Sequence, residues 1–170
     1  RDGVVRRLEA NLDDLCIMSR PPTDIDIHDD IFLPNPLILV APAGHRLADR
    51  RALGFDALRG ERFILREQGS GTRMATDEHF RRHKFRPDIR LELGSNEAIK
   101  QSVAGGLGLA VVSAHALGER PEQEGVVPLD VTGFPIESNW HIVHRGGARL
   151  SPIAAAFRKL LLDQARSFQL

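Results

Sequence analysis

Short apolar runs alternate with amphipathic, helix-like stretches along most of the chain. Each run has the length of a buried strand, and the predicted strands cover Leu15–Met18, Leu37–Ala41, Phe63–Leu65, Ile89–Leu93, Leu109–Val112 and Trp140–His144. Helical spacing predicts helices at Thr72–His83 and Glu97–Ala104, with a short helical turn near Asp56–Leu58. Strands that alternate with helices are typical of an α/β fold whose parallel sheet is covered on both faces.

The chain opens with an amphipathic helix that places Val4, Val5, Leu8 and Leu12 on one face. An α/β sheet usually begins with a strand that precedes its first helix. We therefore expect an N-terminally truncated piece of a longer protein, without the first strand of its sheet.

The last helix has a clear start, with Ser151 as N-cap and Pro152 at the first helical position. Its apolar stripe consists of Ile153, Phe157, Leu160, Leu161 and Phe168. We expect this helix to pack back on the first lobe of the chain.

Two lobes are expected. Residues 1–60 and 128–170 are assigned to lobe I and residues 61–127 to lobe II, so that the chain crosses between lobes near Gly60 and near Val127. In lobe I the segment that ends at Asn35 is interpreted as an acidic stretch without a strand, and it contains Asp24, Asp26, Asp29 and Asp30.

The composition of the chain argues against several classes of function. The 170 residues are 42% hydrophobic, enough for a real core, and carry 23 basic and 23 acidic side chains. A net charge of +0 argues against a dedicated nucleic-acid surface in this chain. Cys16 is the single cysteine, so it is expected to be a small buried hydrophobe. No run is long enough for a membrane span, and the expected location is the cytoplasm.

Signatures of catalysis are absent from the sequence. Ser70 lacks the flanking glycines of a nucleophile elbow, and no Gly-x-x-x-x-Gly-Lys-Ser/Thr motif occurs. The pair Gly106 and Gly108 precedes a strand instead of a helix, which excludes a dinucleotide fingerprint. We expect no enzyme activity.

Metal binding is also unsupported. His79 and His83 have a helical i, i+4 spacing but no third ligand, and the arginines and lysine around them indicate a solvated helix face. His28 beside two aspartates is interpreted as part of the acidic surface. The prediction is no metal and no cofactor.

The stretch Phe63–Arg73 is the part of the sequence that most strongly indicates ligand binding. An apolar strand passes through Gly69-Ser70-Gly71-Thr72 into a helix, and a similar step, Gly94-Ser95-Asn96, follows the next strand. Helix N-termini attract anions because their first N–H groups lack partners. Polar groups that follow these strands should converge on one sheet edge. The candidates are Arg66, Ser70, Thr72, Arg73, Asn96 and Ser113. Helix capping alone is the alternative role for Ser70 and Thr72, and an internal carboxylate such as Glu67 is the alternative partner for Arg73.

These motifs, taken in order, resemble the effector-binding domain of LysR-type transcriptional regulators. The resemblance is carried by Phe63–Arg73, by the long stretch Gly94–Ser113, by Leu15–Met18 with Leu37–Gly44, and by the last helix. Within the family, Arg66–Arg73 together with Trp140–Arg145 is most similar to the RuBisCO-operon regulators of autotrophic bacteria.

The resemblance implies two Rossmann-like lobes joined by two crossover strands, as in periplasmic binding proteins. It implies a small anionic effector in the cleft between the lobes, a phosphorylated metabolite or NADPH for the RuBisCO type. It also implies homodimers through these domains, and tetramers that bind operator DNA through an N-terminal winged helix-turn-helix, which this sequence does not contain. Carried over by position, Ser19 and Arg20 after the first predicted strand join the candidates, and part of the pocket in lobe I is expected to be missing.

Two alternatives remain open. A periplasmic solute-binding protein of a transporter would share the fold, and a signal peptide upstream would favour it. An enzyme with a similar two-lobe fold, such as a deaminase or prephenate dehydratase, would need an acid, base or nucleophile motif that the sequence lacks.

Overall fold

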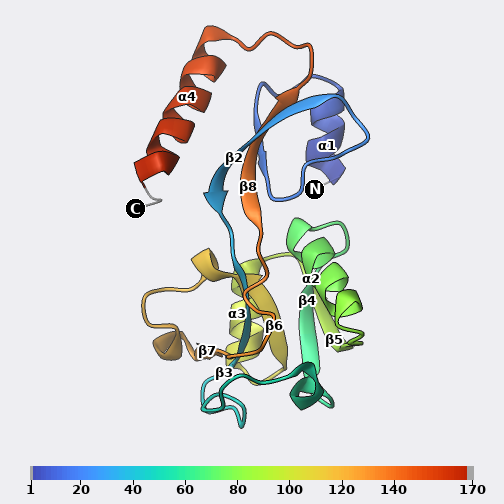
Figure 1. Cartoon of the computed structure of the whole chain (residues 1–170), viewed down its shortest axis with the longest axis vertical. Coiled ribbons are helices and arrows are strands. Elements are labelled where there is room, and N and C mark those ends of the chain that lie inside the picture. Colours follow the sequence, from blue (N-terminus) through green and yellow to red (C-terminus); the bar gives the residue numbers. More distant parts are fainter. Residues whose placement is uncertain (1, 168–170) are drawn as a thin grey trace. The chain divides into compact units, whose positions relative to one another are not determined.

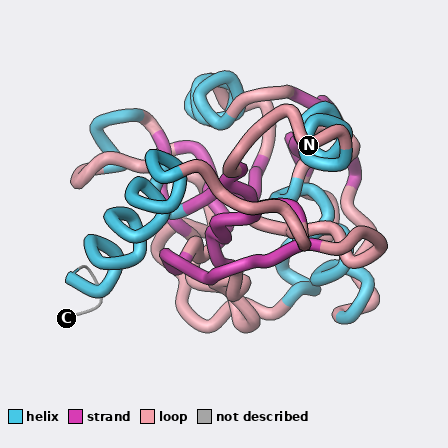
Figure 2. The backbone as a smooth tube through the Cα atoms, turned by 90° about the horizontal axis from the view of Figure 1, so that it is seen from above, coloured by secondary structure: helices cyan, strands magenta, loops and turns pink. Residues whose placement is uncertain are grey.

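The computed structural model describes residues 2–167, and the side chains of residues 2–165. The chain forms two compact units, residues 1–35 with 138–170, and residues 36–137. Figure 1 labels most of their helices and strands, and Figure 2 shows the same chain by secondary structure. Phe168 of the expected apolar stripe lies outside the described residues.

The first unit is built on a three-stranded antiparallel sheet. Its order is β1 (Cys16–Met18), β8 (Asn139–Arg145), β2 (Ile27–Pro34). Helix α1 (Asp2–Glu9) buries Leu8 against Cys16, Met18 and Val143. The helix ends before Leu12, which is 64% exposed. A small core of this kind needs α1 because each strand offers only alternate residues to one face.

Strand β2 was not expected, because four aspartates in and before it suggested a loop. In the structure β2 pairs with β8 along its whole length. Two of its acids have partners on neighbouring elements: Asp29 Oδ2 lies 2.8 Å from His141 Nδ1, and Asp30 Oδ2 accepts from Arg158 Nε at 2.9 Å. The prediction of a loop was wrong because the partners of these acids are distant in sequence.

Helix α4 (Pro152–Ser167) begins as predicted. The Ser151 hydroxyl accepts from the Ala154 N–H at 3.2 Å, which is the expected N-cap. The predicted stripe does not face the unit, because Ile153, Phe157 and Leu160 are 83%, 50% and 54% exposed. The face that α4 buries instead carries its small residues Ala154 and Ala165.

The second unit holds a five-stranded sheet in the order β5-β4-β6-β3-β7. The strands are β3 (Leu37–Pro42), β4 (Arg62–Arg66), β5 (Asp88–Leu93), β6 (Leu109–Ser113) and β7 (Val126–Pro128). Strand β4 is parallel to β5 and β6, whereas β3 is antiparallel to β6 and β7. The sheet is therefore mixed, not wholly parallel as expected.

Two helices cover the two faces of this sheet. Helix α2 (Gly71–Arg82) contributes Ala75 and Phe80 to a core with Leu39, Phe63 and the alternate residues of β6. Helix α3 (Asn96–Ala104) packs Ile99 and Val103 against the residues between these, among them Val40, Ile64 and Ala110. Successive residues of each strand are thus buried on opposite faces of the sheet. For this reason the strands appear in the sequence as continuous apolar runs. Short 3₁₀ turns lie at Phe55–Leu58, Ala114–Ala116 and Pro121–Glu124.

The division into units differs from the expected boundaries near residues 60 and 128. The chain leaves the first unit between Asn35 and Pro36 and returns to it between Glu137 and Ser138. The reason is strand β3, which was assigned to lobe I but hydrogen-bonds to β6 and β7 of the second unit. Hydrophobic periodicity identifies a strand but not the strand that it pairs with.

Candidate functional site

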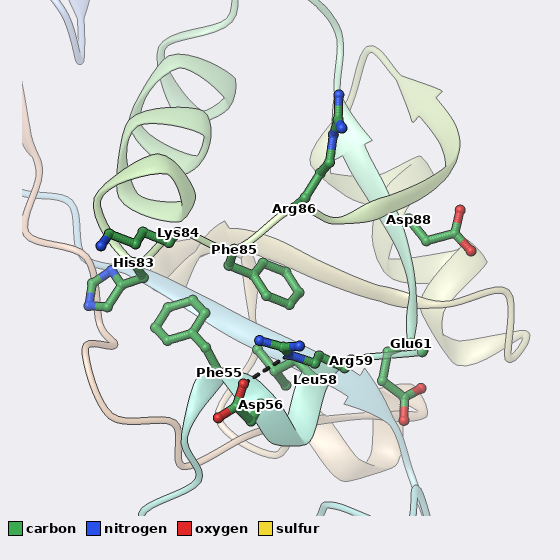
Figure 3. A pocket seen from close by; sticks show the side chains of 11 residues that line it. Phe55, Asp56, Leu58, Arg59, Glu61, His83, Lys84, Phe85, Arg86 and Asp88 are labelled. Carbon is green, nitrogen blue, oxygen red and sulfur yellow. Dashed lines mark ion pairs between the residues drawn. The ribbon is translucent and has the colours of Figure 1, made fainter.

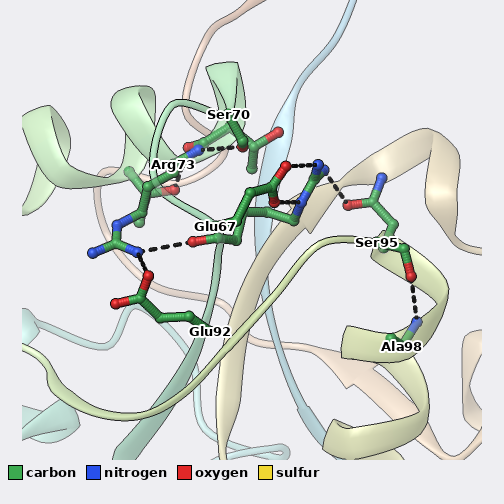
Figure 4. A network of polar contacts seen from close by, with 10 residues as sticks. Glu67, Ser70, Arg73, Glu92, Ser95 and Ala98 are labelled. Carbon is green, nitrogen blue, oxygen red and sulfur yellow. Dashed lines mark hydrogen bonds and ion pairs between the residues drawn. The ribbon is translucent and has the colours of Figure 1, made fainter. Parts of the chain in front are cut away.

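Two strand-to-helix turns lie side by side at one edge of the second unit. Strand β4 ends at Arg66 and the chain then turns into α2, while the neighbouring β5 ends at Leu93 and turns into α3. Arg66 and Leu93 are register partners in this parallel pair. The two helix starts therefore come together as the sequence predicted (Figure 4).

Both helix starts are capped by serine. The Ser70 hydroxyl accepts from the Arg73 N–H at 3.0 Å and the Ser95 hydroxyl accepts from the Ala98 N–H at 3.1 Å. Ser70 is buried, at 6% exposure. Its capping contact accounts for its conformation without a ligand.

Arg66 connects the two turns. Its Nε and Nη2 donate to the two carboxylate oxygens of Glu67 at 2.8 and 3.0 Å, and its Nη1 donates to Asn96 Oδ1 at 3.3 Å. The Arg66 side chain is 18% exposed. A guanidinium held in this way at the carboxyl end of a strand is well placed to bind a carboxylate or phosphate.

Glu67 was expected, if anything, to pair with Arg73, but its partner is Arg66. The hydrogen bonds from Arg66 lower the pKa of the Glu67 carboxyl below its usual value. Glu67 is the residue of this group that sequence reasoning did not include among the candidates. The position of Glu67 directly after Arg66, at the end of a strand, could have indicated that the two side chains pair.

Arg73 is held by internal partners. Its side chain is 5% exposed, its Nε lies 2.9 Å from Asp77 Oδ2, and its Nη1 lies 3.0 Å from Glu92 Oε2. The same Nη1 donates to the Arg66 carbonyl at 2.8 Å. These contacts join α2 to the ends of β4 and β5, which is a structural role.

The other candidates differ in what they offer. Thr72 is half-buried in the first turn of α2, where the Gly71 and Thr72 N–H groups have no acceptor among the described residues. Ser113 is 5% exposed at the end of β6, and its hydroxyl accepts from the His115 N–H at 3.2 Å. Ser19 and Arg20 directly follow β1 in the first unit, and both are half-buried.

A separate cavity of about 320 Å³ lies at the opposite end of β4, where the strand begins (Figure 3). Phe55 and Phe85 form its apolar wall, with ring centroids 5.5 Å apart. His83 stacks on Phe55 at 4.3 Å. Charged side chains of both signs line the cavity around these rings.

His79 does not lie on a solvated helix face as predicted. It is half-buried between His83 and Phe134, with ring centroids 4.4 and 4.9 Å away, and burial lowers its pKa. Among the described residues, no group of three or more histidine, cysteine or acidic side chains is arranged to hold a metal ion. Across residues 2–167, no helix combines the length and apolarity that a membrane crossing requires.

Comparison with known proteins identifies the family of the chain. The sequence profile of the LysR substrate binding domain matches residues 1–166. The chain is 41% identical over 165 residues to a RuBisCO operon transcriptional regulator of Allochromatium vinosum, which covers 97% of this chain and 55% of that protein. It is 39% identical over 169 residues to the HTH-type transcriptional activator CmpR of Synechocystis, covering 98% and 56%. The chain thus spans about half the length of these curated relatives.

Solved structures support the same fold. The Synechocystis PCC6803 CcmR regulatory domain in complex with 2-PG (2-phosphoglycolate) is 42% identical, with a TM-score of 0.91 over 96% of this chain and 78% of that one. The effector binding domain of QuiR in complex with shikimate has a TM-score of 0.86 at 18% identity over 97% and 78% of the chains, which shows the fold alone. The comparisons give no support to a transporter protein. The chain therefore belongs to the LysR substrate-binding domain family, with relatives among the RuBisCO-operon regulators.

Proposed function

We propose that this domain senses a small phosphorylated acid and thereby controls the transcription of carbon-fixation genes. The observation that carries the proposal is the position of Arg66 at the carboxyl end of β4, beside the N-terminus of α2. The likeness to a regulatory domain solved with 2-PG supports the same ligand class.

Three features of this edge suit a phosphate. Arg66 supplies a planar set of donors, and the first turn of α2 adds the N–H groups of Gly71 and Thr72, which have no acceptor among the described residues. The Thr72 hydroxyl is a further donor, and Asn96 orients the guanidinium from the neighbouring turn. A contribution from Ser113, at the end of the neighbouring strand β6, is part of the same proposal.

The larger protein is proposed to act as a non-enzymatic DNA-binding regulator in the cytoplasm. Its relatives are transcriptional regulators about twice as long as this chain. Operator binding, homodimers through this domain, and tetramers of the whole protein are part of the same proposal, which the relationship supports. NADPH is a second candidate effector.

Calorimetric titration tests the ligand class. We expect the protein to bind 2-phosphoglycolate and not glycolate, because glycolate lacks the phosphate that the helix start would hold. Arg66→Ala with Thr72→Ala should weaken 2-phosphoglycolate binding by about tenfold or more without unfolding the domain. Arg62→Ala, an exposed arginine at the other end of β4, is the matched control and should leave affinity unchanged. Unchanged affinity in the double variant would show that the site lies elsewhere.

A further inference from the structure

All three guanidinium nitrogens of Arg66 are engaged by protein atoms. Two of them, Nε and Nη2, form a bidentate pair with Glu67, and Nη1 donates to Asn96. Parallel N–H···O bonds between arginine and a carboxylate are the same contacts that arginine makes with a bound carboxylate or phosphate. We call Nε and Nη2 together the Arg66 fork. An anionic ligand that binds to this fork therefore has to take the place of Glu67.

The side chain of Glu67 can move away from Arg66 while its main chain stays in place. Its main chain is anchored on both sides, because its N–H donates to the Leu93 carbonyl at 3.1 Å and its carbonyl accepts from the Ser70 N–H at 3.3 Å. Its side chain is 43% exposed, against 18% for Arg66. Rotation of the glutamate into water thus leaves both of these main-chain hydrogen bonds intact, and a released glutamate regains side-chain entropy.

Asn96 holds the remaining nitrogen of the guanidinium group. It contacts Nη1, which Glu67 does not use, and it comes from the first turn of α3. Arg66 therefore keeps a fixed orientation while Nε and Nη2 exchange one acceptor for another. The exchange replaces a charge pair by a charge pair, so no buried cation is left without a partner.

We infer that Glu67 is an internal competitor of the effector: it occupies the Arg66 fork in the effector-free protein and swings into solvent when an anionic effector takes its place. This inference rests on the proposed function. It also makes Glu67 a specificity-determining residue, because a ligand has to bind the fork better than a tethered carboxylate does. Phosphate-bearing acids meet that condition better than neutral or zwitterionic metabolites.

The alternative role for Glu67 is direct contact with the effector, as an acceptor for a hydroxyl or ammonium group. The two roles predict opposite results for Glu67→Gln, which keeps the size of the side chain and removes its charge. If Glu67 competes, the variant binds the anion more tightly. If Glu67 holds the ligand, the variant binds it more weakly.

The experiment is a calorimetric titration of the protein with 2-phosphoglycolate. We expect Glu67→Gln to tighten binding by about threefold to tenfold. Glu97→Gln is the matched control, since Glu97 lies next to Asn96 but pairs with Lys100 and Gln101. If both variants bind 2-phosphoglycolate more tightly by the same factor, the cause is the loss of a negative charge in general, and the inference is overturned. Weaker or unchanged binding in Glu67→Gln would also overturn it.

A double-variant cycle adds a second test. In an Arg66→Gln background, Glu67→Gln should have no effect on affinity, because the fork for which Glu67 competes is gone. Tightening that persists in that background overturns the inference and leaves the proposed function intact. By contrast, the proposed function and this inference are both overturned if the native protein binds no 2-phosphoglycolate, or if it binds 2-phosphoglycolate with an affinity that Arg66→Gln leaves unchanged.

The Glu67 carboxyl can also be observed directly by carbon-detected NMR. Addition of 2-phosphoglycolate should raise the Glu67 pKa towards its usual value, because the hydrogen bonds that lower it are lost. A Glu67 pKa that stays low in the complex means that the pair with Arg66 is kept, and that result overturns the inference.

Discussion

Arg73 of α2 and Glu92 of β5 form an ion pair, with Nη1 3.0 Å from Oε2. The same guanidinium contacts Asp77 one turn along the helix and the carbonyl of Arg66 at the end of β4. A cation in the first turn of a helix is unfavourable for the helix dipole. These partners compensate for that position, and they join α2 to two strands.

Arg73→Ala should therefore act on stability. Its removal deletes several charge-assisted hydrogen bonds from a buried position and leaves Asp77 and Glu92 without their partner. We expect the free energy of unfolding, measured in urea, to fall by about 1–3 kcal/mol. Arg82→Ala is the control on the same helix, since its side chain is 68% exposed and forms an ion pair with the neighbouring Glu78; it should change stability by about 0.5 kcal/mol or less. Equal losses in the two variants would contradict this role.

Ser70 is expected to act as a cap more than as a ligand. Ser70→Ala removes the acceptor for the Arg73 N–H and should cost about 1 kcal/mol of stability. Ser70→Asp keeps a capping oxygen and should retain the native thermal midpoint. Its extra negative charge near Arg66 should nevertheless weaken 2-phosphoglycolate binding. Thermal melts and ligand titrations on both variants separate the two roles, and a destabilised Ser70→Asp would argue against capping.

Gly108 is a position where no side chain fits. A Cβ atom there would lie 2.5 Å from the Arg62 carbonyl oxygen, and its φ of +156° is one that other residues rarely adopt. Strands β4 and β6 are neighbours at this point. Gly108→Ala should lower the free energy of unfolding by about 3 kcal/mol or more. Gly54→Ala, with nothing within 4 Å of its Cβ, should be tolerated. Comparison of their urea midpoints checks this.

His79 should make stability depend on pH. Burial, with the nearby His83 and Arg82, lowers its pKa in the folded protein. The unfolded chain therefore binds a proton more readily, at the usual histidine pKa of about 6.5, and the free energy of unfolding falls as the pH drops through that value. The fall ends below the lowered pKa of the folded state.

Urea unfolding between pH 5 and 8 measures this effect. His79→Phe keeps an aromatic ring against Phe134 and should flatten the pH dependence. His115→Gln changes an exposed histidine of the same unit and leaves His79 in place, so its pH profile should follow that of the native protein. An unchanged slope in His79→Phe would assign the pH dependence to other groups.

Much of the local structure could be predicted from the pattern of residues. The positions of β3 to β6, of α2 and of α3, and the caps at Ser70 and Ser151, follow from periodicity and from hydrogen bonds between near neighbours. That the ends of β4 and β5 meet at one sheet edge follows from the rule that neighbouring parallel strands place their carboxyl ends together. Strand β2 could not be predicted in this way. Its aspartates are compatible with a strand only because His141 and Arg158, more than a hundred residues away, provide their partners.

The sequence by itself determined the class of this domain and the edge of the sheet where its candidate site lies, because capping, strand length and helical spacing depend on residues close together in the chain. Only the tertiary structure decided which unit β3 joins, that Arg73 is tied to Glu92, and that Arg66 is held by Glu67 and Asn96. The physical reason is that a charged side chain has several possible partners within reach along the sequence. The choice among them depends on strand order and register, which arise only when distant segments pack together.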